Sequence, residues 1–286
     1  MPGKLYLVAT PIGNLADITL RALETLKRVE LVAAEDTRRT RALLSHFQIS
    51  GKELLACNAY ASESALAGLI QRLTQGASIA LVTDAGTPSV SDPGTELVRA
   101  AVSAAIEVVP IPGVSAVTTA VAVSGLVEGA FCFLGFPPVK GSGRRAFFER
   151  VLGSLEPSVL FEAPHRTQRT LSDLARLAPA RVAVLCRELT KLHEEVRRGT
   201  LSELAQNEHA FRGEITLVID RAEEPSQVPN EEDAAVLEAA IVEQLGAGAS
   251  PRSVVDALLA GSRVPRRELY RQVTEIAQRL AQDSDS

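Results

Sequence analysis

Short apolar runs alternate with amphipathic segments along the chain from Leu5 to Phe136. Runs such as Leu5–Ala9 and Ile79–Val82 are continuous and end at turn-forming residues, which is typical of strands buried on both faces. Between such runs, apolar residues recur at helical spacing, as in Ser62–Thr74. The alternation predicts an α/β fold with a mostly parallel sheet that helices cover on both faces.

The pattern changes at two places along the chain. The stretch Gly135–Gly143 is rich in glycine and proline, which predicts a hinge to a second α/β unit. After a polar segment, helical periodicity predicts three further helices at Glu231–Leu245, Pro251–Leu259 and Pro265–Ala281. We therefore expect α/β domains at residues 1–128 and 129–222, a linker at 223–230, and an all-α, helix-turn-helix-like module at 231–286.

Composition narrows the functional classes. The 286 residues are 46% hydrophobic, and 30 Lys and Arg residues stand against 35 Asp and Glu residues, so any nucleic-acid site must come from a local basic patch. The three cysteines lie far apart without a CxxC pair, which argues against a zinc ribbon or disulfide scaffold and favours a reducing cytoplasm. No run of about 20 unbroken apolar residues occurs, so we expect no membrane span. The His193-Glu194 pair has no second His four residues on, which excludes a zincin helix, and we expect no metal centre.

Three loops that follow predicted strands carry the clearest functional signal. Thr10–Leu15, Thr83–Gly94 and Pro110–Ala116 are rich in Gly, Pro, Ser and Asp, whereas the GxGxxG, P-loop and GxSxG signatures are absent. In an open α/β sheet, the loops at the carboxyl ends of the strands form the ligand crevice. Any one of these loops could be a plain tight turn, but three together favour a shared ligand site.

The same loops resemble those of a known family, the bacterial small-subunit rRNA cytidine 2′-O-methyltransferases, which belong to the tetrapyrrole methylase fold group. The likeness covers Lys4 to Arg221 in order, and the tail is similar to that family's helical C-terminal module. In the wider fold group one motif reads Gly-Asp-Pro, whereas Gly86-Thr87-Pro88 here sets the chain apart from porphyrin methylases. The similar motifs are Ala9–Leu15, Ala34–Arg38, Asp84–Pro88 with Ser91–Gly94, Ile111–Ser115 and Phe161–Arg166.

The resemblance implies a cofactor, a substrate and an assembly. It implies S-adenosylmethionine bound in the cleft between the two α/β domains, methyl transfer to the ribose of a decoding-centre cytidine in 16S rRNA, and a homodimer. No metal is implied. The residues that the resemblance assigns to the cofactor are Pro11, Gly13, Asp84, Gly86, Thr87, Val90, Ser115, Ala116 and Phe161.

Methyl transfer to a ribose hydroxyl needs a group that accepts the hydroxyl proton, and such a group typically accelerates a reaction by about 10²–10⁴-fold. The candidates are Glu35, Asp36, Glu162 and His165, which follow two predicted strands. Spacing does not choose among them, because Asp36 could instead cap a helix and His165 could be a turn residue. Asp84 could likewise face the sulfonium or only fix its own loop.

An RNA substrate also requires cations that neutralise phosphates. Local basic groups occur near Arg38, near Lys140 and near Arg187, and each could also be an ordinary solvated surface. The tail holds 6 basic and 10 acidic residues from Glu231 onward, which leaves its contact with RNA open. The candidate RNA contacts are Arg38, Arg39, Arg144, Arg145, Arg166, Arg187 and Lys191.

Two other functions remain compatible with the sequence. One is a small-molecule methylase of the same fold that acts on a tetrapyrrole or a diphthine-type substrate, and the other is an RNA-binding module without catalysis. The dispersed arginines and the Gly86-Thr87-Pro88 motif argue against a small-molecule methylase. The intact loops at the strand ends speak against the second.

Overall fold

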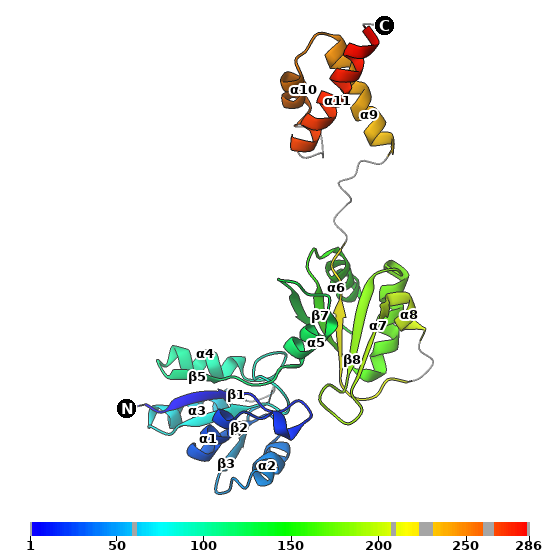
Figure 1. Cartoon of the computed structure of the whole chain (residues 1–286). Helices are drawn as coiled ribbons and strands as arrows, with labels where there is room; N and C mark the ends of the chain where they lie inside the picture. Colours follow the sequence, from blue (N-terminus) through cyan, green and yellow to red (C-terminus); the bar gives the residue numbers. More distant parts are fainter. Residues whose placement is uncertain (1, 59–61, 207–209, 223–230, 260–265, 285–286) are drawn as a thin grey trace. The chain divides into compact units, whose positions relative to one another are not determined.

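A computed structural model describes residues 2–58, 62–206, 210–222, 231–259 and 266–284. The chain divides into two compact units, Met1–Ala222 and Glu223–Ser286 (Figure 1). Among the described residues, the first unit contains two five-stranded sheets and the second contains three helices. The expected combination of two α/β folds with a helical tail is confirmed. The expected linker at 223–230 lies outside the described residues.

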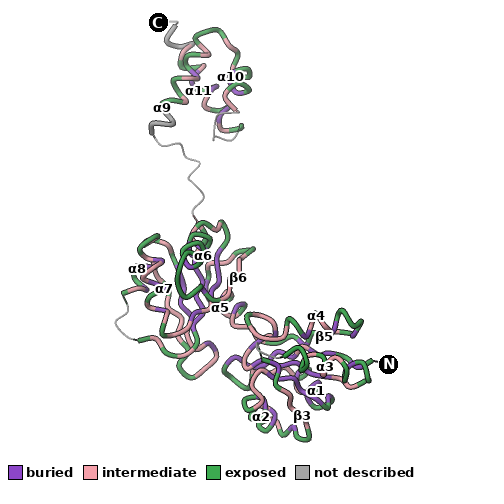
Figure 2. The backbone as a smooth tube through the Cα atoms, turned by 180° about the vertical axis from the view of Figure 1, so that it is seen from behind, coloured by how far each residue is buried: buried purple, intermediate pink, exposed green. Residues whose placement is uncertain are grey.

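The first sheet is entirely parallel, in the order β3-β2-β4-β1-β5. Every residue of β2 and β4 is buried, because helices pack on both faces of the sheet, as the continuous apolar runs predict. In Figure 2 the buried backbone lies inside each sheet and the exposed backbone lies mainly on helices and loops. The strands are β1 (Lys4–Val8), β2 (Leu31–Ala34), β3 (Glu53–Ala56), β4 (Ile79–Val82) and β5 (Glu107–Ile111).

Two pairs of helices supply the cover of this sheet. On one face, Leu26 and Leu44 pack with Val32 and Val82. On the other face, Leu69, Leu73 and Leu97 pack with strand residues such as Leu81. The first pair is α1 (Leu20–Arg28) and α2 (Thr37–His46), and the second pair is α3 (Glu63–Thr74) and α4 (Thr95–Ser103).

The second sheet is mixed, in the order β6-β7-β10-β8-β9. Only β6 and β7 are parallel, whereas β10 is antiparallel to β7 and β8, and β9 is antiparallel to β8. The mostly parallel arrangement that the sequence predicts for the first α/β domain does not extend to this sheet, since β8 and β9 are joined by a connection too short for the crossover that parallel strands need. The strands are β6 (Cys132–Gly135), β7 (Ser158–Glu162), β8 (Val182–Arg187), β9 (Glu195–Thr200) and β10 (Ile215–Ile219).

Helix α5 (Ala116–Ser124) connects the two sheets of the first unit. It follows β5 of the first sheet, and its Val117 and Ala120 pack in one apolar cluster with Val159 and Val218 of the second sheet. The opposite face of the second sheet is covered by α6 (Ser142–Gly153), α7 (Pro164–Leu177) and α8 (Leu201–Ala205). The α5 cluster buries apolar surface between the halves and so favours a fixed relation between them.

The tail unit folds around a small core of its own. Ser250 caps α10 by accepting a hydrogen bond from the Ser253 N–H at 3.3 Å, and Pro251 occupies the first helical position. The core contains Ile241, Val254 and Leu269. Within the described part of the chain, no helix has the length and apolar character that a membrane crossing requires. The helices are α9 (Glu231–Gly246), α10 (Pro251–Leu258) and α11 (Arg266–Ser284).

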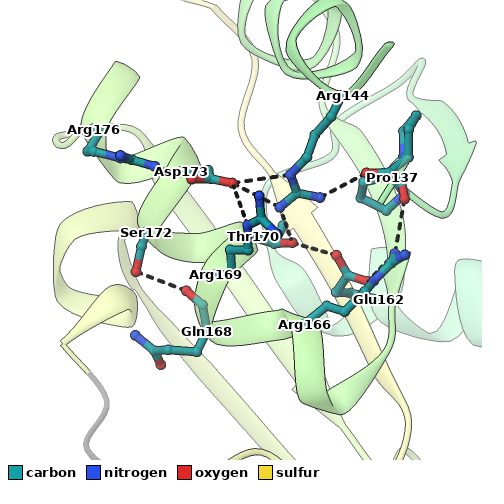
Figure 3. Close-up of polar contacts among 11 residues, drawn as sticks. Pro137, Arg144, Glu162, Arg166, Gln168, Arg169, Thr170, Ser172, Asp173 and Arg176 are labelled. Atoms are coloured by element: carbon teal, nitrogen blue, oxygen red, sulfur yellow. Dashed lines mark hydrogen bonds and ion pairs between the residues drawn. The ribbon is translucent and has the colours of Figure 1, made fainter. Parts of the chain in front are cut away.

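A buried arginine ties α6 to α7 in the second half of the first unit (Figure 3). Arg144 is only 6% exposed. Its Nε and Nη2 donate to Asp173 Oδ2 at 3.1 and 3.0 Å, its Nη1 donates to the Pro138 carbonyl at 3.1 Å, and its Nη2 also donates to Thr170 Oγ1 at 2.9 Å. Burial of this charge is tolerated because it is hydrogen-bonded and faces a carboxylate.

The same network reaches the end of β7. The Thr170 hydroxyl donates to Glu162 Oε2, and Arg166 Nε donates to Glu162 Oε1 at 2.7 Å. Arg166 Nη2 also donates to the Pro137 carbonyl at 3.0 Å. The network thus holds the segment after β6 against the start of α7 (Figure 3).

We expect the Arg144→Met variant to lose about 3 kcal/mol of unfolding free energy, because Asp173 and Thr170 would lose a buried partner. Urea denaturation of the full chain, followed by circular dichroism, measures this change. The control is Arg145→Met, an exposed neighbour in the same helix, whose substitution should change stability by less than about 0.5 kcal/mol. Equal losses in the two variants would contradict a structural role for Arg144.

Candidate functional site

A cavity of about 350 Å³ lies where the loops of the first sheet meet the second sheet. Its size is within the range of small-molecule sites. The first half contributes residues that follow β1, β4 and β5, and the second half contributes the ends of β6, β7 and the start of β10. The lining residues are Ile12, Ala85, Gly86, Thr87, Val90, Ser91, Asp92, Ser115, Ala116, Phe136, Phe161, Glu162, Ala163, Pro164, Glu214, Ile215 and Thr216.

Two backbone hydrogen bonds join the loops after β1 and β4. The Thr10 N–H donates to the Gly86 carbonyl at 2.9 Å, and the Gly86 N–H donates to the Thr10 carbonyl at 3.0 Å. The Thr10 hydroxyl adds a bond to the Thr83 carbonyl at 3.0 Å. Gly86 has a φ of +84°, a conformation that glycine adopts at little cost. The cavity wall on this side is therefore a fixed backbone structure.

The long loop after β4 contains unusual backbone conformations. Ser89 and Ser91 have φ values of 70° and 61°, and Gly94 has a φ of 125°. A Cβ atom on Gly94 would lie 2.6 Å from Leu81 Cδ2, so only glycine fits there. Left-handed conformations of non-glycine residues cost about 1–3 kcal/mol each and tend to occur at functional sites. This loop presents Val90, Ser91 and Asp92 to the cavity.

Aromatic side chains form the wall that the second half provides. The Phe161 ring centroid lies 4.9 Å from that of Phe133 and 5.5 Å from that of Phe136. Phe136 lines the cavity although 52% of it is exposed. The rings of Phe133 and Phe136 are inclined by 66° and 56° to that of Phe161, so Phe136 and Phe161 present an apolar wall against which the ring of a ligand could lie.

The start of α5 gives the cavity an electropositive side. Ser115 is the residue before the helix, and no side chain caps the helix there. Both Ser115 and Ala116 line the cavity. Because the first N–H groups of a helix have no partner within it, they are suited to bind an anionic group of a ligand.

Three carboxylates gather beside the cavity, after β2 and β4. The Asp84 N–H donates to Glu35 Oε2 at 3.1 Å, and Asp84 Oδ1 accepts from the Asp36 N–H at 3.2 Å. The third member, Asp92, lines the cavity itself. Burial, followed by the negative charges of Glu35 and Asp84, raises the pKa of Asp92 to about 7. Asp92 was not among the sequence candidates, although it lies in a motif that carries the family resemblance.

Six of the nine residues assigned to the cofactor line this cavity: Gly86, Thr87, Val90, Ser115, Ala116 and Phe161. Pro11 and Asp84 instead line a neighbouring cavity of about 400 Å³, together with Arg39 and His46. Gly13 packs against the loop after β8, where an added Cβ would lie 2.3 Å from Lys191 Cγ.

The structure does not bring the four candidate proton acceptors together. Asp36 caps α2 and pairs with Arg38 at 2.8 Å, and the hydrogen bonds from Arg38 hold the pKa of Asp36 well below its usual range. Glu35 accepts from the Asp84 backbone. Glu162 lines the cavity, but both of its oxygens are engaged in the α6–α7 network. His165 is exposed in the first turn of α7.

The candidate RNA contacts fall into two groups. Arg38, Arg39 and Arg145 are exposed; Arg38 pairs with Asp36, Arg39 lies 3.4 Å from Asp84, and Arg145 has no ion pair within the described residues. The other four are engaged in the protein: Arg144 and Arg166 belong to the α6–α7 network, Arg187 pairs with Glu195 at 2.8 Å, and Lys191 contacts Glu188 at 2.8 Å and Glu214 at 3.1 Å.

Metal ligands do not gather anywhere in the part of the chain that the structure describes. No group of three or more His, Cys, Asp or Glu side chains there has the arrangement that could hold a metal ion. The site therefore consists of a cavity with apolar, backbone and carboxylate walls.

Comparison of the whole chain with curated proteins identifies close relatives. The chain is 41% identical over 276 residues to the ribosomal RNA small subunit methyltransferase I of Streptococcus pyogenes serotype M3, covering 96% of both chains. Proteins of the same name from Halalkalibacterium halodurans and Synechocystis sp. are 40% and 42% identical, covering 94% and 96% of this chain and 93% and 98% of theirs.

Solved structures and a family profile agree on the fold. The uroporphyrin-III C-methyltransferase of Thermus thermophilus, crystallised with S-adenosylhomocysteine, has a TM-score of 0.54 at 20% identity and covers 76% of this chain and 97% of its own. The methyltransferase CobJ has a TM-score of 0.60 at 16% identity and covers 77% of this chain and 95% of its own. Residues 4–205 match the family Tetrapyrrole (Corrin/Porphyrin) Methylases. The chain belongs to the tetrapyrrole methylase family and, within it, to the ribosomal RNA small subunit methyltransferase I proteins.

Proposed function

We propose that this chain transfers a methyl group from S-adenosylmethionine to the ribose 2′-hydroxyl of a cytidine in 16S rRNA of the small ribosomal subunit. The observation that carries the proposal is the cavity lined by Gly86, Thr87, Ser115, Ala116 and Phe161, in a chain whose relatives are named for small-subunit rRNA methylation. No observation specifically favours a tetrapyrrole or diphthine-type substrate, because the solved methylases of small molecules are similar in fold alone.

The residues around the cavity fit S-adenosylmethionine, which supplies an electrophilic methyl group on a cationic sulfur when bound. Phe161 and Ile215 offer apolar surface to the adenine ring. The uncapped start of α5 suits the carboxylate of the methionine part. The carboxylates on the β4 side favour its positive charges.

In this proposal the loops around the cavity position the reacting atoms in addition to binding the cofactor. Methyl transfer requires the accepting oxygen and the methyl carbon to be about 3 Å apart and in line, and such positioning supplies roughly 7–11 kcal/mol of the barrier. The Thr10–Gly86 backbone pair and the left-handed Ser89 and Ser91 hold the loop after β4 in one conformation. Side chains from both halves of the first unit line the cavity in which the reacting groups would meet.

The RNA-facing surface in this proposal consists of Arg38 and Arg39 at the start of α2 and Arg145 in α6. Their guanidinium groups are exposed and so are available to phosphates. Arg144, Arg166, Arg187 and Lys191 are left out of this surface, because each pairs with a carboxylate and at most 27% of its side chain is exposed, whereas the paired Arg38 and Arg39 are 85% and 66% exposed. From the family resemblance we further infer that the chain forms a homodimer and acts in the cytoplasm. Size-exclusion chromatography of the purified chain with light scattering tests the dimer.

The direct test of this function uses purified full-length chain, S-adenosylmethionine with a labelled methyl group, and small ribosomal subunits from cells that lack this protein. We expect label in 16S rRNA, on the ribose of one cytidine, when nuclease fragments are mapped by mass spectrometry. The control omits the chain. Label that appears only in an added porphyrin, or on a base in place of a ribose, would contradict the proposal.

A substitution inside the cavity should separate cofactor binding from folding. We expect Ala116→Leu to raise the dissociation constant for S-adenosylmethionine at least about tenfold, because the larger side chain fills space that the ligand needs. Isothermal titration calorimetry measures this affinity. The matched control is Thr118→Leu, an exposed position on the same helix, which should bind normally. Normal binding by both variants would place the cofactor elsewhere.

Removing one exposed arginine side chain should weaken the binding of RNA and leave the affinity for the cofactor unchanged. We expect Arg145→Glu to weaken binding to the small subunit and to reduce the slope of log affinity against log salt by about 1, since one phosphate contact is lost. Filter binding at several salt concentrations measures both values. Arg99→Glu, an exposed arginine of α4 outside the proposed surface, is the charge-matched control. An unchanged slope for Arg145→Glu would remove α6 from the RNA surface.

A further inference from the structure

Transfer of a methyl group to a hydroxyl oxygen releases a proton, and the cavity must contain a group that accepts it. A ribose hydroxyl is a weak acid, so the acceptor must reach the oxygen while the O–C bond forms. Three carboxylates line the cavity: Asp92, Glu162 and Glu214. The chemistry requires one of them to have a free oxygen and an affinity for a proton near neutral pH.

Two of these carboxylates are already engaged. Glu162 Oε1 accepts from the Ala163 N–H at 2.8 Å and from Arg166 at 2.7 Å, and its Oε2 accepts from Thr170. Both oxygens of Glu162 are therefore occupied by donors of the protein, and neither is free for a substrate proton. Glu214 pairs with Lys191 at 3.1 Å and is largely exposed. Its charge is therefore stabilised by a neighbouring cation and by water.

Asp92 differs from both in its surroundings. It forms no ion pair with any residue that the structure describes. The charged groups that face it are Glu35 after β2, Asp84 after β4 and, more weakly, Glu214 before β10. Arg39 of α2 lies 3.4 Å from Asp84 Oδ2, so its charge faces Asp84. Asp92 is thus the member of this carboxylate group that has no cationic partner among the described residues, although the Thr83 hydroxyl beside it lowers its pKa in part.

Burial and the neighbouring carboxylates Glu35 and Asp84 account for the raised pKa of Asp92. Glu35 accepts from the Asp84 N–H, and Asp84 accepts from the Asp36 N–H and lies beside Arg39, so each of these carboxylates has a donor or a cation as its partner. A third negative charge nearby is unfavourable, and burial adds to the penalty. The pKa of Asp92 is consequently raised to about 7. A general base is most effective when its pKa lies near the working pH.

The backbone around Asp92 directs it to the cavity. The residue follows Ser91, whose φ is 61°, and precedes Gly94, whose φ is 125°. A Cβ on Gly135 would lie 3.2 Å from Ser91 Oγ, so the loop touches the end of β6 as well as its own half. Strain of this kind is retained where it positions a functional group.

We propose that Asp92 is the general base of the methyl transfer and accepts the proton of the attacking hydroxyl. This inference rests on the proposed function. In the step, the hydroxyl oxygen forms a bond to the methyl carbon, the carbon–sulfur bond breaks with its electron pair left on sulfur, and the hydroxyl proton passes to an oxygen of Asp92. The products are a methyl ether, S-adenosylhomocysteine and a neutral Asp92, which loses its proton to water afterwards.

The kinetic test compares the wild-type chain with Asp92→Asn, which keeps the size of the side chain and removes its basicity. We expect single-turnover methylation of small subunits at saturating donor to fall by about 10²–10⁴-fold. The wild-type rate should rise about tenfold per pH unit up to an inflection at or below about pH 7, because the bound cation favours the charged carboxylate. The variant should lose this inflection. Glu107→Gln, an exposed carboxylate paired with Lys4, is the control.

A second variant acts on Asp92 without changing it. Glu35→Gln keeps an oxygen that can accept the Asp84 N–H and removes a negative charge that faces Asp92. The pKa of Asp92 should fall, so the inflection of the methylation rate should move to lower pH. This shift is expected even if Asp92→Asn fails to fold. A structural role for the loop would lower the rate without moving the inflection.

A third readout needs neither donor nor RNA. Because the pKa of Asp92 is higher in the folded chain than in the unfolded chain, the folded state binds the extra proton between these values, and stability falls as pH rises through this window. The Asp92→Asn variant has no titrating carboxyl at this position and so lacks this fall in stability. The variant should therefore gain melting temperature relative to wild type at about pH 8.5, and gain less at about pH 5.5.

The outcomes separate the two proposals. If the wild-type chain does not methylate rRNA, the proposed function fails. If the wild-type chain methylates rRNA and folded Asp92→Asn keeps a comparable rate with the same inflection, Asp92 is not the base. If Asp92→Asn weakens donor binding in calorimetry but reacts normally at saturation, Asp92 binds the donor's cation instead, and the inference is overturned.

Discussion

The pairing of Thr10 with Gly86 through two backbone hydrogen bonds is the constraint on which the candidate site depends. Parallel pairing of β1 with β4 and β5 brings the carboxyl ends of these strands to one edge of the sheet. The Thr10–Gly86 pair then joins two of the loops into one wall. Without it, the loop that carries Val90 and Asp92 would need to be ordered by the ligand, at a cost in binding free energy.

The second half of the first unit completes the site by a different kind of interaction. Helix α5 presents its uncapped start to the cavity and buries Val117 and Ala120 against the second sheet. The α6–α7 network fixes Glu162 and the segment after β6. The first half thus supplies backbone and carboxylates, and the second half supplies aromatic surface and a fixed frame.

Much of this architecture could be predicted from the sequence, because its signals are local. The continuous apolar runs of β2 and β4 indicate buried parallel strands, and Ser250-Pro251 indicates the start of α10. The antiparallel β8–β9 pair could not be predicted in this way, since the polar sequence of β9, Glu195–Thr200, lacks an apolar run. Pairing partners of that kind are set by tertiary contacts.

The site residues also fall into those that local sequence predicts and those that tertiary contacts determine. The position of Gly86 in a tight turn could be predicted from its loop motif, because a left-handed backbone conformation favours glycine. Charged residues are harder to assign from sequence, since exposure decides their role: Arg144 and Arg145 are neighbours in the chain, yet one is buried and the other exposed. Asp92 could be identified only once Glu35 and Asp84 were found beside it in space.

The most direct measurement is a crystal structure of the chain with S-adenosylhomocysteine bound. We expect the ligand in the cavity between the loop after β4 and the ends of β7 and β10, with its adenine ring near Phe161 and its carboxylate near the start of α5. A ligand bound outside this cavity, with Gly86 and Ala116 untouched, would contradict the account.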